Sequence, residues 1–325
     1  MSTNAQNDIR KTASDLLRSG AVRLVIGWRE APVSGNAKTP DPAIPAFVTR
    51  PEDCSSLVWN DRCDLNLVTY LNRQEVRRYG RIAVCVKGCD ARSLELLRRE
   101  SQVAPKGEGF GDGAAEPGEG TLCVYAIGVA CTGQRSTAAA AESNVETGKT
   151  LTSPYKCEVC DTCVPDAAVC DVVLGADEVT NPASDEVARY ARLEEFMKLT
   201  PDERFAFWKE ELSRCIRCYA CRQICPLCYC NRCIADRNRP QEISSSPSLK
   251  GNVAWNITRA FHLAGRCVGC AQCSSACPMG IDLQLLNLTL ARAAEDAFDG
   301  YRAGVTPLDP VIGTYSLEDK EEFIG

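Results

Sequence analysis

The sequence predicts a fold in two parts. An α/β domain with a partly parallel sheet is expected over residues 1–180, and a mostly α-helical module over 181–300, with a tail from 301 to 325. In the first part, short segments rich in β-branched residues alternate with segments of helical periodicity, which is typical of a sheet covered by helices. In the second part, one cysteine pattern occurs twice, which predicts a small module built around cysteine side chains.

The strands of the first part are predicted where apolar and β-branched residues follow one another without helical spacing. These segments are 21–28, 81–86, 121–129 and 172–175, with a shorter strand expected at 57–59. Residues 31–46 are rich in proline and are expected to form an extended loop. The glycine-rich stretch 104–120 is also expected to be a surface loop, because its acidic side chains would repel a phosphate group.

The helices are predicted where apolar residues recur every three or four positions. The first part has three such segments, at 7–19, 65–78 and 91–100, and Asp90 is expected to cap the last of them. In the second part, 184–214 is expected to be helical with a break at Thr200-Pro201. There Thr200 and Glu203 have the spacing of a capping box. Further helices are expected at 253–263 and 281–294.

The composition places the chain among ordinary globular proteins. The 325 residues are 45% hydrophobic and 25% charged, with a net charge of −6. Nucleic-acid binding would need a basic patch, and no block of Lys and Arg provides one. No apolar run is long enough for a membrane helix, and the polar start lacks the apolar core of a secretory signal. Twenty-one cysteines in such a chain predict metal binding in the reducing cytoplasm rather than disulfides.

The repeated cysteine pattern carries the most specific chemistry. Its first copy is Cys215-x-x-Cys218-x-x-Cys221-x-x-x-Cys225-Pro226, and each cysteine recurs 52 residues later in the second copy, Cys267, Cys270, Cys273 and Cys277-Pro278. This is the spacing of bacterial ferredoxins with two [4Fe-4S] clusters, in which the fourth cysteine of each copy ligates the other cluster. Zinc ribbons and disulfide scaffolds fit it less well, because zinc sites use separated cysteine pairs.

The ferredoxin spacing predicts two four-cysteine sites. The first site comprises Cys215, Cys218, Cys221 and Cys277. The second site comprises Cys267, Cys270, Cys273 and Cys225. The fold class expected for 181–300 is therefore a ferredoxin-type 2[4Fe-4S] module with a cysteine-rich insert.

Seven more cysteines are clustered outside the repeat: Cys157, Cys160, Cys163, Cys170, Cys228, Cys230 and Cys233. This number exceeds what packing requires and predicts a third [4Fe-4S] cluster. The pairs Cys157/Cys160 and Cys230/Cys233 are the expected ligands, because each C-x-x-C pair can chelate. Zinc is the alternative, since four thiolates serve it equally well.

Four isolated residues remain. Two of them have only a structural interpretation, and each of the other two allows a structural and a chemical one. Cys85 and Cys123 fall in predicted strands and are expected to be small buried hydrophobic side chains. Cys89 lies at a strand-to-helix turn, where it is either a reactive thiolate or simply buried. His262, the one histidine, is either a packing residue or a hydrogen-bond donor to cluster sulfur.

Three stretches resemble a known family. The segments 82–92, 156–160 leading to 171–175, and 215–230 are similar to the β subunits of coenzyme F(420)-reducing hydrogenases and formate dehydrogenases. The last segment is similar to the bacterial members that accompany heterodisulfide-reductase-like complexes. The turn Lys87-Gly88-Cys89 departs from the common Lys-Pro-Cys of the family, and the cysteine repeat lies at the C-terminal end rather than first.

The resemblance implies a cytoplasmic iron–sulfur subunit that moves electrons within a larger oxidoreductase. In the family the α/β part binds a flavin, usually FAD, and the matching turn implies Lys87, Cys89, Asp90 and Arg92 as its contacts here. The implied partners are the other redox subunits of a hydrogenase, formate dehydrogenase or heterodisulfide-reductase-like complex. The alternatives are a flavin-dependent oxidoreductase that exchanges electrons with its own clusters, and a zinc-stabilised assembly protein.

Overall fold

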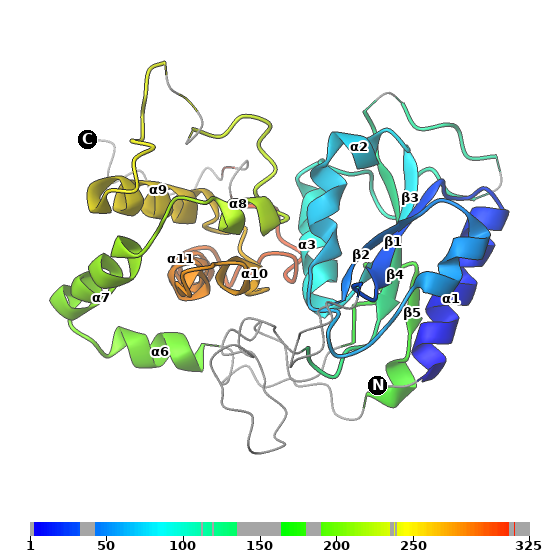
Figure 1. Cartoon of the computed structure of the whole chain (residues 1–325), viewed down its shortest axis with the longest axis horizontal. Coiled ribbons are helices and arrows are strands. Elements are labelled where there is room, and N and C mark those ends of the chain that lie inside the picture. The colour runs from blue at the N-terminus through cyan, green and yellow to red at the C-terminus, as the bar shows by residue number, and fades with distance from the viewer. Residues whose placement is uncertain are drawn as a thin grey trace.

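The structure is a computed structural model that describes residues 3–32, 43–111, 113–118, 120–134, 164–179, 190–234, 237, 239–311 and 315. An α/β part and a helical part lie side by side, with helix α3 (Gly88–Arg99) facing the helical part (Figure 1). The mixed sheet and the helical C-terminal region confirm the coarse division that the sequence predicts.

A five-stranded sheet with the order β2-β1-β3-β4-β5 forms the first part. The strands are β1 (Leu24–Arg29), β2 (Ile44–Val48), β3 (Arg81–Val86), β4 (Cys123–Val129) and β5 (Val172–Leu174). From β1 to β5 the neighbours are parallel, and β2 is antiparallel to β1. The central strands are almost entirely buried, as expected of a parallel sheet covered on both faces.

Strand β2 replaces part of a predicted loop. The expectation of a loop over 31–46 is wrong for residues 44–46, which pair with β1. Pro45 has no N–H donor, so a strand that contains it suits only the edge of a sheet. The edge position of β2 leaves one of its sides without a strand partner, and the proline is tolerated there.

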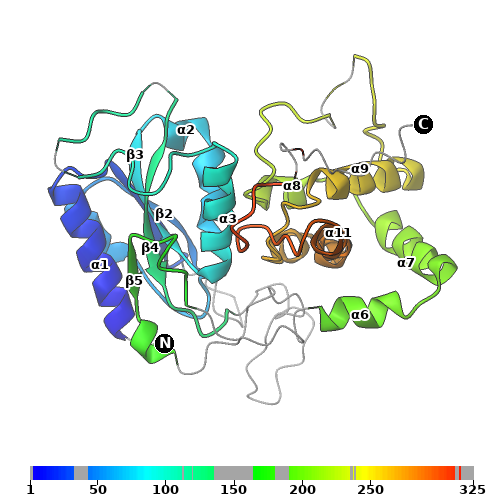
Figure 2. The ribbon, with the colours of Figure 1, turned by 180° about the vertical axis from the view of Figure 1, so that it is seen from behind.

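Helices cover both faces of the sheet. Helix α1 (Thr3–Arg18) packs on β1, β3 and β5, with Ile9 and Ala13 fully buried. Helix α3 packs against β3 and β4 and buries Leu94 and Leu97. The two helices lie on opposite sides of the sheet when the molecule is seen from behind (Figure 2).

The start of α3 differs from the prediction. The helix begins at Gly88, and Lys87 rather than Asp90 is its N-cap residue. Asp90 lies at the third helical position, where its carboxylate accepts a hydrogen bond of 3.1 Å from the Lys87 backbone N–H. A carboxylate at this position can reach back to the N-cap amide, so Asp90 still caps the helix from inside it.

The segment predicted as one helix over 65–78 is divided. It forms the 3₁₀ helix η2 (Leu67–Asn72) and the single-turn α2 (Gln74–Arg77), because Arg73 between them has an extended backbone. Two short 3₁₀ helices complete the first part, η1 (Pro51–Ser56) and η3 (Ala176–Glu178). The stretch at 57–59 contributes a single bridge from Val58 to Trp28.

The second part contains α6 (Ala191–Met197), α7 (Pro201–Ser213), α8 (Ala220–Ile224), α9 (Leu249–His262), α10 (Gln272–Ser275) and α11 (Leu283–Ala297). The predicted break falls at Thr200, whose side chain and that of Glu203 form the expected capping box at the start of α7. Helix α7 packs on α9, and α10 packs on both α8 and α11. Within the described part of the chain, no helix is long and apolar enough to cross a membrane.

The two parts share a buried interface. Leu227, Leu263 and Val268 of the second part belong to the same apolar core as the sheet. Glu100, at the end of α3, pairs with Arg266 at 2.6 Å and accepts a hydrogen bond from the Tyr229 hydroxyl at 2.6 Å. The tail folds back as well, since Arg99 donates to the carbonyl oxygen of Leu308. The α/β part therefore contacts the cysteine-rich part directly.

Candidate metal centres

The cysteine repeat is also a repeat of backbone conformation. Arg217 and Tyr219 have positive φ angles of 61° and 60°, and their counterparts 52 residues later, Gly269 and Ala271, have 72° and 61°. Three of these four residues are not glycine, and each such residue costs roughly 1–2 kcal/mol in this conformation. Left-handed residues within such turns aim successive backbone N–H groups into one concavity, the arrangement found at many iron–sulfur sites.

Side-chain and backbone N–H groups also point at the cysteine sulfurs. The Nδ2 of Asn287, on α11, donates to the Sγ of Cys273 at 3.5 Å, and that of Asn256, on α9, to the Sγ of Cys215 at 3.9 Å. The backbone N–H of Ile281 donates to the Sγ of Cys277 at 3.4 Å. Donors of this kind stabilise an anionic thiolate cluster. The donor set therefore fits [4Fe-4S] clusters.

The described cysteines do not converge on one point. Among the residues that the structure describes, no three His, Cys, Asp or Glu side chains are close enough to hold a single metal ion. A zinc ion needs four ligand atoms within about 2.3 Å of one centre. A [4Fe-4S] cluster binds one thiolate at each of its iron atoms, so its ligands stand farther apart.

The cysteines of the two predicted sites are distributed over two apolar clusters. Cys215, Cys221 and Cys277 lie on a small core around Leu212, Ile243 and Trp255, as does Cys273 of the second site. Cys225 and Cys270 lie on the core that the sheet also forms. Cys225 of the first copy thus lies on the same core as Cys270 of the second.

Burial keeps the Cys221 thiol protonated when no metal is bound. Burial raises its pKa to about 12, Arg259 opposes that rise, and the neighbouring Cys273, Cys228 and Cys277 add to it. Metal ligation requires the thiolate, so binding must release this proton. Cys277 of the second copy therefore lies near Cys221 of the first.

Arg259 lies among the sulfurs of both copies. It projects from α9, is 8% exposed, and donates to the carbonyl oxygen of Cys221 at 3.0 Å. Burial opposes its charge, but the nearby Cys228, Cys225, Cys221 and Cys273 raise its pKa above the usual value. Its Nε has no hydrogen-bond partner among the described residues. No pattern in the sequence distinguishes Arg259, because an arginine on an amphipathic helix is usually solvated.

The residues implied as flavin contacts lie at the carboxyl end of β3. Lys87 and Asp90 are buried and form an ion pair of 2.9 Å, and the Lys87 Nζ also donates to the carbonyl oxygen of Leu65. Burial opposes the Lys87 charge, but Asp90 raises the pKa of Lys87. The ammonium lies 4.5 Å from the ring centre of Trp28. This pair already has a structural role in joining β3 to α3.

Cys89 and Arg92 lie closer to the cysteine-rich part. Cys89 is buried, and it is near enough to Cys270 to raise the pKa of that thiol, although burial is the larger cause. Arg92 lines a small pocket together with Cys267 and Tyr301. The turn after β3 therefore borders the second site.

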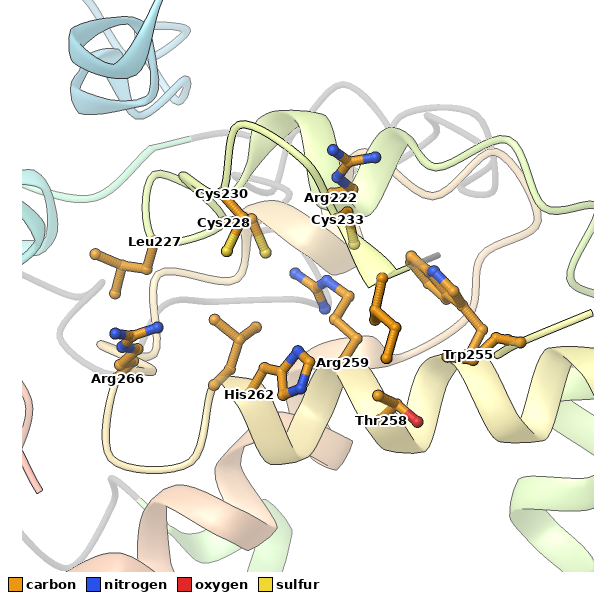
Figure 3. Close-up of a pocket in the computed structure, with 13 residues that line it drawn as sticks. Arg222, Leu227, Cys228, Cys230, Cys233, Trp255, Thr258, Arg259, His262 and Arg266 are labelled. Atoms are coloured by element: carbon orange, nitrogen blue, oxygen red, sulfur yellow. The ribbon is translucent and has the colours of Figure 1, made fainter. Parts of the chain in front are cut away.

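The second cysteine group is only partly described. Cys157, Cys160 and Cys163 lie outside the described residues. Cys170 is buried against Gly128 in the sheet core, away from the repeat, and burial raises its pKa to about 12. Cys228, Cys230 and Cys233 line one cavity above α9 (Figure 3). Cys85 and Cys123 are buried in strands, as predicted.

Comparison with known proteins identifies the repeat. Residues 214–282 match the family model of the 4Fe-4S dicluster domain. The chain is also 35% identical, over 98 residues, to the F(420)-dependent formate dehydrogenase subunit beta of Methanocaldococcus jannaschii. That match covers 30% of this chain and 25% of the relative, so it spans a quarter of the relative's length. The two matches support an iron–sulfur protein of electron transport, and the predicted resemblance to formate dehydrogenase β subunits is confirmed.

Proposed function

We propose that this chain is an iron–sulfur electron-transfer subunit of a larger cytoplasmic oxidoreductase, of the formate dehydrogenase, hydrogenase or heterodisulfide-reductase-like type. The observation that carries the proposal is the doubled C-x2-C-x2-C-x3-C-P pattern within a matched dicluster domain. The similarity to a formate dehydrogenase β subunit supports the class of complex. The partners are accordingly the other redox subunits of that complex.

The first and second sites each hold one [4Fe-4S] cluster, with the fourth ligand exchanged between the copies. Bound clusters supply one-electron transfer. The proximity of Cys221 to Cys277 supports the exchange, as does the position of Cys225 and Cys270 on one core. Asn256, Asn287 and Arg259 stabilise negative charge on the sulfurs, and the apolar residues around Trp255 exclude water.

The exposure of the ligands suggests a direction for the electron path. Cys218 of the first site is exposed, and the second site borders the buried turn after β3. An electron can therefore enter or leave through the first site at the surface, while the second site serves the α/β part. This difference in exposure between the two sites supports a relay between a partner subunit and a redox group at the carboxyl end of the sheet.

The alternative is a flavin-dependent oxidoreductase, in which FAD at the turn after β3 exchanges electrons with the chain's own clusters. The proximity of Cys89 to Cys270 favours it, because that turn and the second site lie next to each other. Within the turn, Arg92 and Cys89 are the residues closest to the second site. Lys87 and Asp90 would act on a flavin only by holding the turn in place.

Anaerobic purification followed by iron, sulfide, zinc and flavin analysis tests the proposal. We expect about eight iron atoms and an equal amount of sulfide per chain from the two sites. Stoichiometric flavin would favour the flavin-dependent alternative. Zinc without iron or sulfide would contradict the proposal and favour the assembly protein.

A further inference from the structure

The cavity above α9 brings together three thiols and a histidine that are not ligands of the first or second site. Cys228, Cys230 and Cys233 line it, together with Arg259 and His262, and Trp255 closes its apolar side (Figure 3). It encloses about 50 Å³. One water needs roughly 10–15 Å³ of such space, so the cavity has room for a group larger than one water.

A hydrogen bond to the α/β part holds the segment that carries the three thiols. Tyr229 does not line the cavity, and its hydroxyl bonds Glu100 of the α/β part at 2.6 Å. Its neighbours Cys228 and Cys230 both line the cavity (Figure 3). The fixed tyrosine therefore sets the direction of two thiols before any ligand binds.

Arg259 is the second observation that points to a ligand. Its guanidinium extends from α9 toward the three cysteines (Figure 3). The side chain is 8% exposed, and its Nε has no partner among the described residues. A buried cation with an unused donor requires a nearby anionic group. An anionic metal–thiolate cluster is such a group.

We propose that this cavity holds a third iron–sulfur cluster, ligated by Cys228, Cys230 and Cys233, with His262 as the nitrogen donor at its open side. Zinc takes the same types of ligand, so the iron and zinc analysis below distinguishes the two groups. The ligand set differs from that predicted from the sequence, because Cys228 and His262 take the places of Cys157 and Cys160. It shares no ligand with the first and second sites, so it does not depend on their assignment.

Alkylation of the native protein tests the proposal without a mutation. Cys230 is exposed, and a free thiol there would react quickly with iodoacetamide. We expect Cys228, Cys230 and Cys233 to be protected in anaerobic, iron-replete protein and to react after the iron is chelated, as mapped by peptide mass spectrometry. Alkylation of Cys230 without loss of iron would overturn the proposal.

Iron analysis of variants gives an independent test. Cys230→Ser and Cys233→Ser are each expected to lose about four of about twelve iron atoms, while Cys54→Ser, a buried thiol in η1, retains them all. Retention of all iron in both variants overturns the proposal, and so does a wild-type content of about eight iron atoms and one zinc. Either result leaves the eight iron atoms of the first and second sites in place, so the proposed function is judged separately.

The single histidine allows a direct test of the fourth ligand. Protein grown with ¹⁵N-histidine contains that label at His262 alone. Pulsed EPR of the reduced protein should then detect a ¹⁵N hyperfine coupling of the size found for a directly bound imidazole, and His262→Leu should abolish it. Absence of the coupling in iron-replete, reduced protein would overturn the assignment of His262.

Discussion

At the scale of single residues, hydrogen bonds to sulfur distinguish the two sites. Asn256 donates to Cys215 of the first site, and Asn287 donates to Cys273 of the second. Reduction adds negative charge to a cluster, and a donor to sulfur stabilises that charge. Each asparagine is therefore expected to raise the reduction potential of the cluster proposed at its site.

Replacing Asn287 by leucine removes the donor and nearly preserves the volume. A net hydrogen bond contributes about 1 kcal/mol, which corresponds to roughly 40 mV for one electron. We expect Asn287→Leu to lower the potential of the second cluster by about this amount and Asn256→Leu to lower that of the first. EPR-monitored redox titration measures both potentials. Equal shifts of both clusters in either variant would contradict the assignment.

The Lys87–Asp90 pair allows a second prediction at this scale. Both side chains are buried, so removing one partner leaves an uncompensated charge. Lys87→Met is expected to lower the free energy of unfolding by roughly 3–5 kcal/mol. The double variant Lys87→Met/Asp90→Leu should recover most of this loss, except for about 1 kcal/mol from the lost helix cap. Denaturant titration of the wild type, the single variant and the double variant measures these free energies of unfolding. If the double variant is no more stable than the single one, the pair does not have a mainly structural role.

At the scale of elements, the two copies of the repeat pack on each other through α8 and α10. This contact brings the end of each copy beside the start of the other. Cys225→Ser is therefore expected to damage the second cluster, and Cys277→Ser the first. Resolved EPR or Mössbauer spectra of the two variants separate the clusters. If each variant loses the cluster nearest in the sequence, the exchange of ligands is wrong.

Elements with a strong local pattern were predictable, and those set by distant contacts were not. Strand β3 was predicted to the residue, because its six residues are uniformly suited to a buried strand. Strand β2 was not predicted, because Pro45 locally favours a loop and only the pairing with β1 makes the segment a strand. The predicted cysteine ligands rest on spacing alone. Arg259 was missed, because its burial depends on cysteines some 30 residues earlier in the chain.

At the scale of the whole molecule, the interface determines how far the two parts depend on each other. The central strands bury most of their surface within the α/β part, against α1 and α3. The cysteine-rich part has small apolar cores, and its sites do not exist in the unfolded chain, so cluster binding contributes to its folding. The shared residues Leu227, Leu263 and Val268 join the two at the outer face of α3.

We therefore predict that chelating or oxidising the clusters unfolds the chain from about residue 215 onward while the strands of the sheet persist. Hydrogen exchange before and after cluster destruction measures this. Amides at 253–290 should lose protection, and those at 81–86 should retain it, because the strand is held by neighbours on both sides. The end of α3 near Glu100 should lose protection in part, since its pairing with Arg266 is lost. Simultaneous loss at 81–86 and 253–290 would instead mean that the two parts fold as one cooperative unit.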